Sequence, residues 1–183
     1  TMFLPDMSRP LLLNVSFDIQ PGLLYLTFSD VVDSLTFDAS SMTIQSSETA
    51  VIGEVVPLTN SSQTSSNNGY LIVVELSRQD LIRVRDIPNL ATTVSNTYVT
   101  MQAFGIDDVF GVDVLAITDG KALQAYEVIP DLEAPVLNSY TLDLDEGTLD
   151  FSFSDLVSES SFEPTFLTLC FRSQKIWSKD CST

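Results

Sequence analysis

Histidine is absent from this chain, and basic residues are few: 8 Lys and Arg stand against 25 Asp and Glu among 183 residues. Histidine is the commonest general base, so its absence excludes the usual serine and cysteine triads and most zinc and haem sites. The formal charge of −17 repels phosphate backbones and anionic lipid surfaces. The composition therefore argues against most enzymes and against nucleic acid as a partner.

Long apolar runs are also absent, although hydrophobic residues make up 44% of the chain. The longest are short stretches such as residues 71–74, whereas roughly 18 apolar residues are needed to cross a bilayer. We therefore expect no membrane insertion. The first residues lack an initiator Met and the features of a signal peptide, which we interpret as the sign of a mature or excised fragment.

Cysteine occurs only at Cys170 and Cys181, close together near the C-terminus. In an oxidising compartment this spacing predicts a disulfide, and two free, buried thiols are the alternative. Two sequons, which begin at Asn14 and Asn60, are candidate N-glycosylation sites if a eukaryote secretes the chain.

An internal repeat is the most informative feature that the sequence does contain. Residues 10–30 and 135–155 align without a gap at an offset of 125, the distance from Pro10 to Pro135, and the similarity continues to residues 42–44 and 167–169. The sequence therefore predicts one complete unit, residues 1–130, and the first half of a second, residues 131–183. The matched pairs include Asp6 with Asp131, Leu12 with Leu137, Asp18 with Asp143, Gly22 with Gly147 and Phe28 with Phe153.

Hydrophobic residues alternate within each unit, as they do in strands with one buried face. Val15, Phe17 and Ile19 alternate with polar residues, and a second alternating run follows the turn at residues 21–22. Residues 11–29 are therefore predicted to form a hairpin.

The remaining elements of the first unit are predicted in the same way. A short helix is expected between residues 77 and 90, ended by Pro88. About seven short strands in about 125 residues are typical of an all-β, immunoglobulin-like Greek-key sandwich, followed here by a second partial copy. The further strands are expected at residues 42–45, 51–58, 70–76, 98–103 and 112–117.

Several segments resemble the immunoglobulin-like repeats of bacterial surface-layer proteins of the SbsA-like kind. LTFSDVVD at residues 26–33, followed by MTIQ at residues 42–45, looks like their opening strands. Residues 80–81, 90–93, 96–99 and 106–111 look like their closing strands and their D-x-x-G-N loop, in which Val112 replaces the usual Asn. The resemblance covers residues 6–170 and implies tandem repeats in an extracellular surface or filament protein.

Four aspartates are candidate calcium ligands at the junction between repeats. Asp6 and Asp131 precede the proline that opens each unit, while Asp107 and Asp108 lie in a loop near the end of the first. If they meet, their carboxylates supply the oxygen ligands that calcium requires. The alternative is that they are ordinary turn-forming aspartates that cap backbone amides. No other cofactor is expected.

These observations favour a non-enzymatic structural module of an extracellular filament or cell-surface layer, which self-associates and contacts neighbouring immunoglobulin-like repeats. Because the second unit holds only its first strands, its apolar face and sheet edges need cover, and strand completion between chains is one way to supply it. The alternative is an adhesion module whose loops bind glycan or protein ligands.

Overall fold

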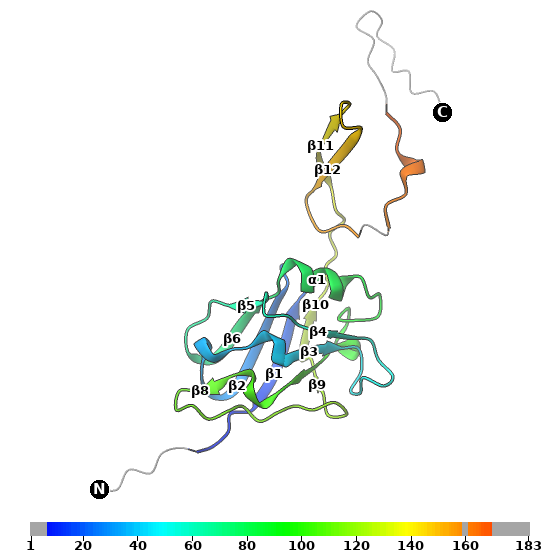
Figure 1. The fold of residues 1–183 in the computed structure, drawn as a ribbon. Coiled ribbons are helices and arrows are strands. Elements are labelled where there is room, and N and C mark those ends of the chain that lie inside the picture. The colour runs from blue at the N-terminus through cyan, green and yellow to red at the C-terminus, as the bar shows by residue number, and fades with distance from the viewer. Residues whose placement is uncertain (1–6, 159–160, 170–183) are drawn as a thin grey trace, which may run out of the picture. The chain divides into compact units, whose positions relative to one another are not determined.

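The computed structural model describes residues 7–158 and 161–169, and the chain divides into two compact units (Figure 1). Unit 1 is Thr1–Glu133 and unit 2 is Ala134–Thr183. The described residues are mostly β-structure with one α-helix. No helix among them is long and apolar enough to cross a membrane.

One sheet of unit 1, sheet A, has six strands within the described residues. Its order is β10-β1-β2-β6-β5, and β8 pairs with the end of β2. Strand β10 runs parallel to β1, and the other neighbours are antiparallel. The bounds are β1 (Leu12–Asp18), β2 (Leu23–Asp33), β5 (Gln63–Thr64), β6 (Gly69–Glu75), β8 (Asp107–Asp108) and β10 (Glu127–Ile129).

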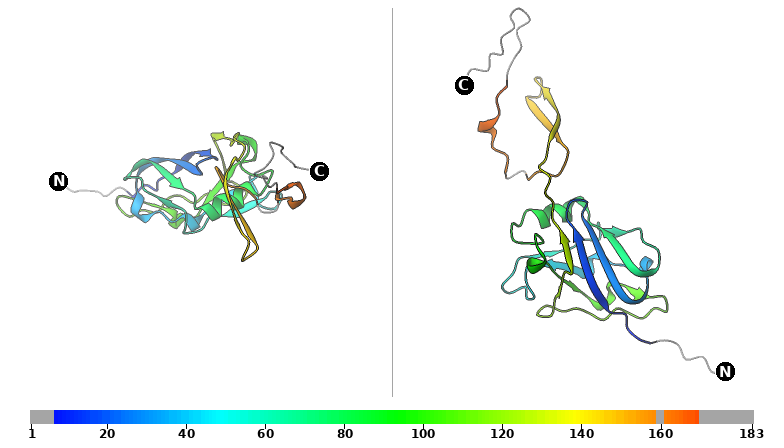
Figure 2. Two further views of the ribbon diagram at one scale, coloured as in Figure 1. Left: turned by 90° about the horizontal axis from the view of Figure 1, so that it is seen from above. Right: turned by 180° about the vertical axis from the view of Figure 1, so that it is seen from behind.

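The second sheet of unit 1, sheet B, has four strands within the described residues, in the antiparallel order β4-β3-β7-β9. Sheet B lies in front of sheet A in Figure 1, and the view from behind in Figure 2 brings sheet A to the front. Unit 1 is thus a two-layered β-sandwich. The bounds are β3 (Met42–Gln45), β4 (Val55–Pro57), β7 (Tyr98–Met101) and β9 (Leu123–Gln124).

The predicted hairpin is present as β1 and β2, in which Val15 is opposite Leu26 and Phe17 is opposite Leu24. The alternation along both strands directs one set of side chains between the sheets, where they are fully buried. Burying one such side chain stabilises a fold by about 1.5–3 kcal/mol. Buried residues of both sheets form the core, among them Val15, Phe17, Leu24, Leu26, Phe28, Met42, Ile44, Ile72, Val74, Val99 and Met101.

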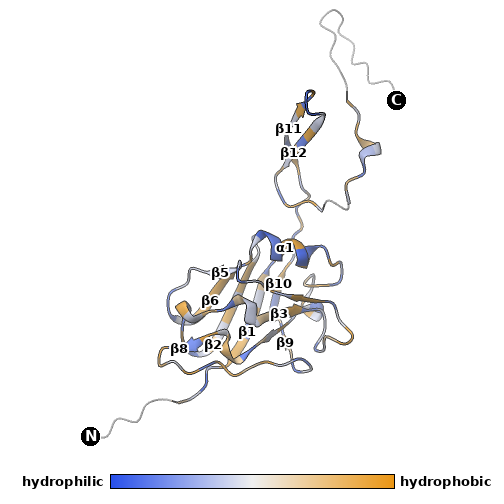
Figure 3. Cartoon of the chain, viewed as in Figure 1, coloured by the Kyte–Doolittle hydropathy of each residue, from blue (hydrophilic) through white to orange (hydrophobic). Residues whose placement is uncertain are grey.

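The helix α1 (Arg78–Arg85) joins β6 to β7 and so leads from sheet A to sheet B. Ser77 caps its first turn, because the Ser77 side chain accepts a hydrogen bond from the backbone N–H of Asp80 at 3.1 Å. Leu81 and Val84 face the core, whereas hydrophilic colours cover much of the helix in Figure 3. The predicted helix is therefore confirmed, although it ends at Arg85, before Pro88.

Two strand predictions need correction. Residues 112–117 form no strand but only the isolated bridges Asp107–Asp113 and Met101–Ile117, because the carboxylate of Asp108 holds the preceding segment in a tight turn. The strand predicted at residues 51–58 is shorter in the structure, where only β4 is present. Two hydrogen bonds between Ser46 and Glu54 close a turn ahead of it.

Short 3₁₀ helices connect several strands. Those of unit 1 are η1 (Ser34–Thr36), η2 (Ala39–Ser41), η3 (Val94–Asn96) and η4 (Ala103–Gly105), and unit 2 has η6 (Pro164–Phe166). An aspartate side chain caps both η1 and η2: Asp33 accepts from the N–H of Leu35, and Asp38 accepts from the N–H of Ser40. Local side-chain hydrogen bonds therefore stabilise both turns.

Unit 2 contains the antiparallel hairpin of β11 (Leu137–Asp143) and β12 (Thr148–Phe153). Each of its residue pairs lies 125 positions after a pair of the β1–β2 hairpin; thus Phe17–Leu24 corresponds to Leu142–Leu149. The register shift also recurs, after Leu12 in one hairpin and after Leu137 in the other. The turn glycines adopt similar positive φ angles, 71° at Gly22 and 68° at Gly147.

The same offset relates hydrogen bonds outside the two hairpins. The capped turn at η2 is an example: the N–H of Ser41 bonds the carbonyl of Asp38, and 125 residues later the N–H of Phe166 bonds the carbonyl of Glu163. Two further pairs of hydrogen bonds are related by this offset. The N–H of Ser29 donates to the carbonyl of Leu11, as that of Ser154 does to Val136. The hydroxyl of Thr36 donates to the carbonyl of Asp33, as that of Ser161 does to Ser158.

Candidate functional site

Three aspartates lie close together at one end of unit 1, which we call the acidic end. Asp107 in β8 is opposite Asp33 in β2, and it forms an isolated bridge with Asp113. Burial raises the pKa of Asp107, and the neighbouring charge of Asp113 raises it further. Arg9 offsets part of this charge, since its guanidinium lies 3.8 Å from the Asp113 carboxylate and donates to the carbonyl oxygens of Asp113 and Val114.

Asp108 is adjacent to this group but belongs to the interior. Its Oδ1 accepts hydrogen bonds from the N–H groups of Phe110 and Val112, each at 2.8 Å, and the side chain is buried. Its Oδ2 is buried without a hydrogen-bond partner among the described residues. Because neighbouring strand residues point to opposite faces, Asp107 and Asp108 do not present their carboxylates to one ligand. Asp108 acts as the cap of a turn.

Asp131 lies at the opposite end of unit 1. Strand β8, which holds Asp107 and Asp108, pairs with the last residues of β2. Asp131 instead follows β10, which pairs with the last residues of β1. Those residues of β1 lie beside the start of β2. The 11 residues of β2 separate the two ends by about 30 Å. The structure thus does not bring Asp107 and Asp108 together with Asp131, and Asp6 lies outside the described residues.

No group of three or more acidic or cysteine side chains in residues 7–158 and 161–169 is arranged to hold a metal ion. Several of the aspartates instead cap turns, which is the alternative to calcium binding. Asp33, Asp38, Asp108 and Asp131 each accept a hydrogen bond from a backbone N–H two residues further along the chain. A calcium site that includes Asp6 stays a prediction.

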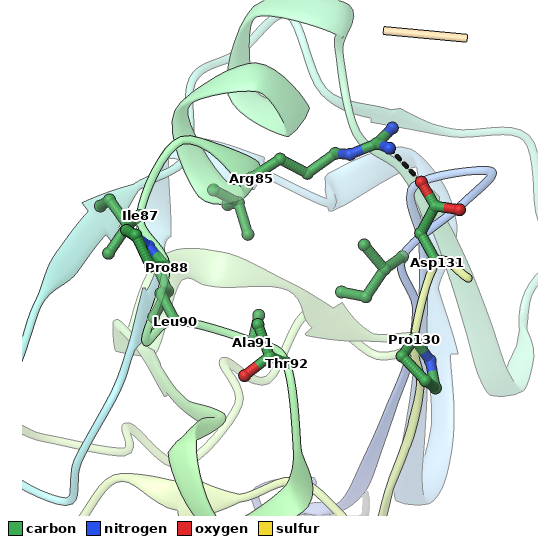
Figure 4. Close-up of a pocket in the computed structure, with 10 residues that line it drawn as sticks. Arg85, Ile87, Pro88, Leu90, Ala91, Thr92, Pro130 and Asp131 are labelled. Carbon is green, nitrogen blue, oxygen red and sulfur yellow. Dashed lines mark hydrogen bonds and ion pairs between the residues drawn. The ribbon is translucent and has the colours of Figure 1, made fainter. Parts of the chain in front are cut away.

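An ion pair holds the end of unit 1, and we call it the exit latch. The guanidinium of Arg85, in the last turn of α1, pairs with Oδ2 of Asp131 (Figure 4). The other oxygen of Asp131 accepts from the N–H of Glu133 at 3.0 Å, and Gln20 donates to the Glu133 carboxylate at 3.1 Å. The latch therefore binds the chain to unit 1 as far as Glu133.

A cavity of about 260 Å³ lies beneath the exit latch (Figure 4). Its wall is mainly apolar, and Arg85 and Asp131 supply its charged groups. Ala91 in this wall has φ of 55°, a left-handed conformation that costs a residue other than glycine of order 1 kcal/mol. The lining residues are Ile19, Val84, Arg85, Ile87, Pro88, Leu90, Ala91, Thr92, Pro130 and Asp131.

Breaking the exit latch should loosen the chain locally. We expect Arg85→Gln to lower the steady-state ¹⁵N{¹H} NOE of residues 131–133 to that of a mobile linker, because the charge that fixes Asp131 is lost. The free energy of unfolding should fall by only about 1 kcal/mol. Arg78→Gln on the exposed surface of the same helix is the matched control. Unchanged NOE values in Arg85→Gln would show that the ion pair does not restrain this segment.

A second polar group ties α1 to the turn at residues 59–62. The buried carboxylate of Asp80 accepts hydrogen bonds at Oδ2 from the Thr59 N–H, from the Thr59 hydroxyl and from the Ser62 hydroxyl, at 2.9, 2.9 and 2.7 Å. Arg83 donates to Oδ1 at 3.1 Å. Burial by itself raises the pKa of Asp80, but the hydrogen bonds from Thr59, Ser62 and Ser77 outweigh burial and hold that pKa below its ordinary value.

Both candidate glycosylation residues are exposed. Asn14 lies on the outer surface of β1, opposite Thr27. Asn60 lies in the turn held by Asp80, and Ser62 of its sequon is buried with its hydroxyl bonded to that carboxylate. A glycan at Asn60 would therefore have to be attached before this turn folds. Cys170 and Cys181, the predicted disulfide, lie outside the described residues.

Large apolar side chains are exposed in the loops of the acidic end. Leu35 in η1 is 91% exposed, and Phe104 in η4 and Phe110 after β8 are also exposed. Two hydrogen bonds hold these loops together: the N–H of Asp107 donates to the Thr36 hydroxyl at 2.8 Å, and the N–H of Asp38 donates to the carbonyl of Gly105 at 2.9 Å. Exposed apolar side chains on adjoining loops are a candidate contact surface.

Sequence reasoning did not identify the exit latch or the Asp80 group. The sequence signal for the second was present, because Ser77 followed three residues later by Asp80 marks a capped helix start. The signal for the first was the recurrence of Asp131, but its partner Arg85 is 46 residues away in the chain. Comparisons of the chain with family models, with curated proteins and with solved structures give no significant match.

Proposed function

We propose that this chain is a non-enzymatic structural module of an extracellular filament or cell-surface layer, built from immunoglobulin-like Greek-key units. The observation that carries the proposal is the hydrogen-bond pattern that recurs at an offset of 125 residues in the two units. Recurrence of turns, caps and strand register together is expected when one folding unit is repeated along a chain. Tandem units of this kind typically form extended structural proteins.

The strand order of unit 1 supports the immunoglobulin-like assignment. One sheet of such a fold joins the first, second, fourth and fifth strands, and the other joins the third, sixth and seventh. Here β1, β2, β5 and β6 share sheet A, whereas β3, β7 and β9 share sheet B. Strand β4 then adds to the edge of sheet B, and α1 makes the crossing between the sheets.

Strand completion is the proposed route of assembly. Within the described residues, β11 and β12 form a sheet of their own without a third strand. We propose that neighbouring immunoglobulin-like repeats, including repeats of other chains, supply the strands that cover this hairpin. A strand supplied by one repeat to another links the two repeats through backbone hydrogen bonds.

The exposed apolar loops of the acidic end favour a second candidate function, an adhesion module. Leu35, Phe104 and Phe110 project from loops that a rigid sandwich positions, as in many binding domains. If these loops bind a glycan or protein ligand, Leu35→Ser with Phe110→Ser should abolish saturable binding, whereas substitution of the exposed Leu71 of β6, Leu71→Ser, should leave it unchanged.

Electron microscopy of the native material, combined with mass analysis of its chains, tests the structural proposal. Ordered polymers with an axial repeat would support the structural role. Dispersed monomers that bind a ligand with saturation would contradict it and favour the adhesion module.

A further inference from the structure

The hairpin of unit 2 has an unpaired edge within the described residues. Strand β12 pairs there only with β11, whereas its counterpart β2 in unit 1 has β1 on one edge and β6 on the other. An unpaired edge presents free N–H and carbonyl groups that readily bind another strand. A two-stranded hairpin by itself is also only marginally stable in water.

The described residues also leave the apolar face of this hairpin uncovered. Val15 and Phe17 of unit 1 are 0% exposed, whereas their counterparts at the offset of 125, Tyr140 and Leu142, are 63% and 42% exposed. The two hairpins have the same register, so the difference in exposure lies in what covers each of them among the described residues and not in the hairpin itself.

Unit 1 shows which strand belongs at the edge. Strand β6 runs antiparallel to β2, with Val74 opposite Leu24 and Ile72 opposite Leu26. All four of these side chains are fully buried. At the offset of 125, Leu24 becomes Leu149 and Leu26 becomes Phe151, so the edge of β12 retains two large apolar side chains at the same register positions.

We propose that the edge of β12 that has no partner among the described residues binds an antiparallel strand of the β6 type, an extended segment with β-branched or other apolar residues at alternating positions. Its inward residues lie opposite Leu149 and Phe151. This inference rests on the proposed function, because it takes unit 2 to be a second copy of unit 1. It goes further by naming the chemistry of the partner and its register.

A synthetic peptide of residues 68–77 is the probe, added to the full chain and followed by NMR hydrogen exchange. We expect exchange of the β12 amides that do not bond β11 to slow by about tenfold or more. The amides of β2 should not change, because β6 already occupies that edge. A peptide with Ile72→Asp and Val74→Asp, and a chain with Phe151→Asp, should each give no protection.

Absence of protection at β12, or equal protection by the Asp-containing peptide, would overturn the inference. These results are separable from failure of the proposed function. Native polymers without peptide binding would refute only the β6-type partner, whereas peptide binding by a protein that forms no native polymer would refute only the structural role.

Discussion

Asp80→Ala is expected to lower the free energy of unfolding of unit 1 by about 3–4 kcal/mol, because a hydrogen bond to a charged group contributes about 1.5–3 kcal/mol and buried partners lose their acceptor. Three donors converge on Oδ2 of Asp80, and the Ser62 hydroxyl among them is itself buried. Single domains are stable by only about 5–15 kcal/mol, so the loss is a large fraction. Urea denaturation followed by circular dichroism measures it.

Asp86→Ala is the matched control for this substitution. Asp86 is the C-cap of the same helix and is exposed, so its removal should change the free energy of unfolding by no more than about 0.5 kcal/mol. Equal losses in Asp80→Ala and Asp86→Ala would contradict the central place given to the Asp80 carboxylate.

The contribution of Asp80 should also depend on pH. Its folded-state pKa lies below the ordinary value of 3.8, so the stabilisation is complete above that value and disappears as the pH falls through the folded-state pKa. Asp107 acts in the opposite direction, since its pKa is raised. The difference between wild type and Asp80→Asn isolates Asp80, and it should shrink on acidification below pH 3.8.

Gly105→Ala is expected to destabilise unit 1 by about 2–3 kcal/mol through overpacking. A Cβ at this position would lie 2.4 Å from Oγ of Ser41 and 2.8 Å from Cγ of Met101. Neither neighbour moves freely: Met101 is buried in β7, and the Ser41 hydroxyl donates to the carbonyl of Asp38 at 2.6 Å. Thermal unfolding, monitored by calorimetry, measures the loss.

Two further variants separate crowding from the general effect of replacing glycine. Gly69→Ala places a Cβ no closer than 3.9 Å to any neighbour, so we expect a change of no more than about 0.5 kcal/mol. Ser41→Gly removes one crowded side chain and should make Gly105→Ala less costly, which a double-mutant cycle detects as coupling. A Gly105→Ala protein as stable as Gly69→Ala would refute the steric argument.

The elements with regular alternation were predictable from the sequence. Val15, Phe17, Leu24 and Leu26 follow a period of two over two long strands, and the intervening Gly22 permits the turn. Strand β3 has the predicted bounds. The strand predicted at residues 112–117 is absent, because the Asp108 carboxylate accepts hydrogen bonds from the N–H groups of Phe110 and Val112 and holds the preceding segment in a turn that the hydrophobic pattern does not indicate.

The candidate site was less predictable, because it depends on which residues meet in space. Asp107, Asp108 and Asp131 appear equivalent as acidic residues near the end of the unit, yet the direction of β10 carries Asp131 away from the other two. Arg85 lies on the helix that connects sheet A to sheet B, and nothing in its local sequence identifies Asp131 as its partner. The short strands β9 and β10 have too few residues for a period to be recognised.

Single-molecule stretching of the native polypeptide tests the proposed tandem array most directly. A chain of repeated units of about 125 residues should unfold in a series of equal steps, each of which lengthens the chain by about 40 nm. A single unfolding step, or steps with no common length, would contradict an array of immunoglobulin-like units.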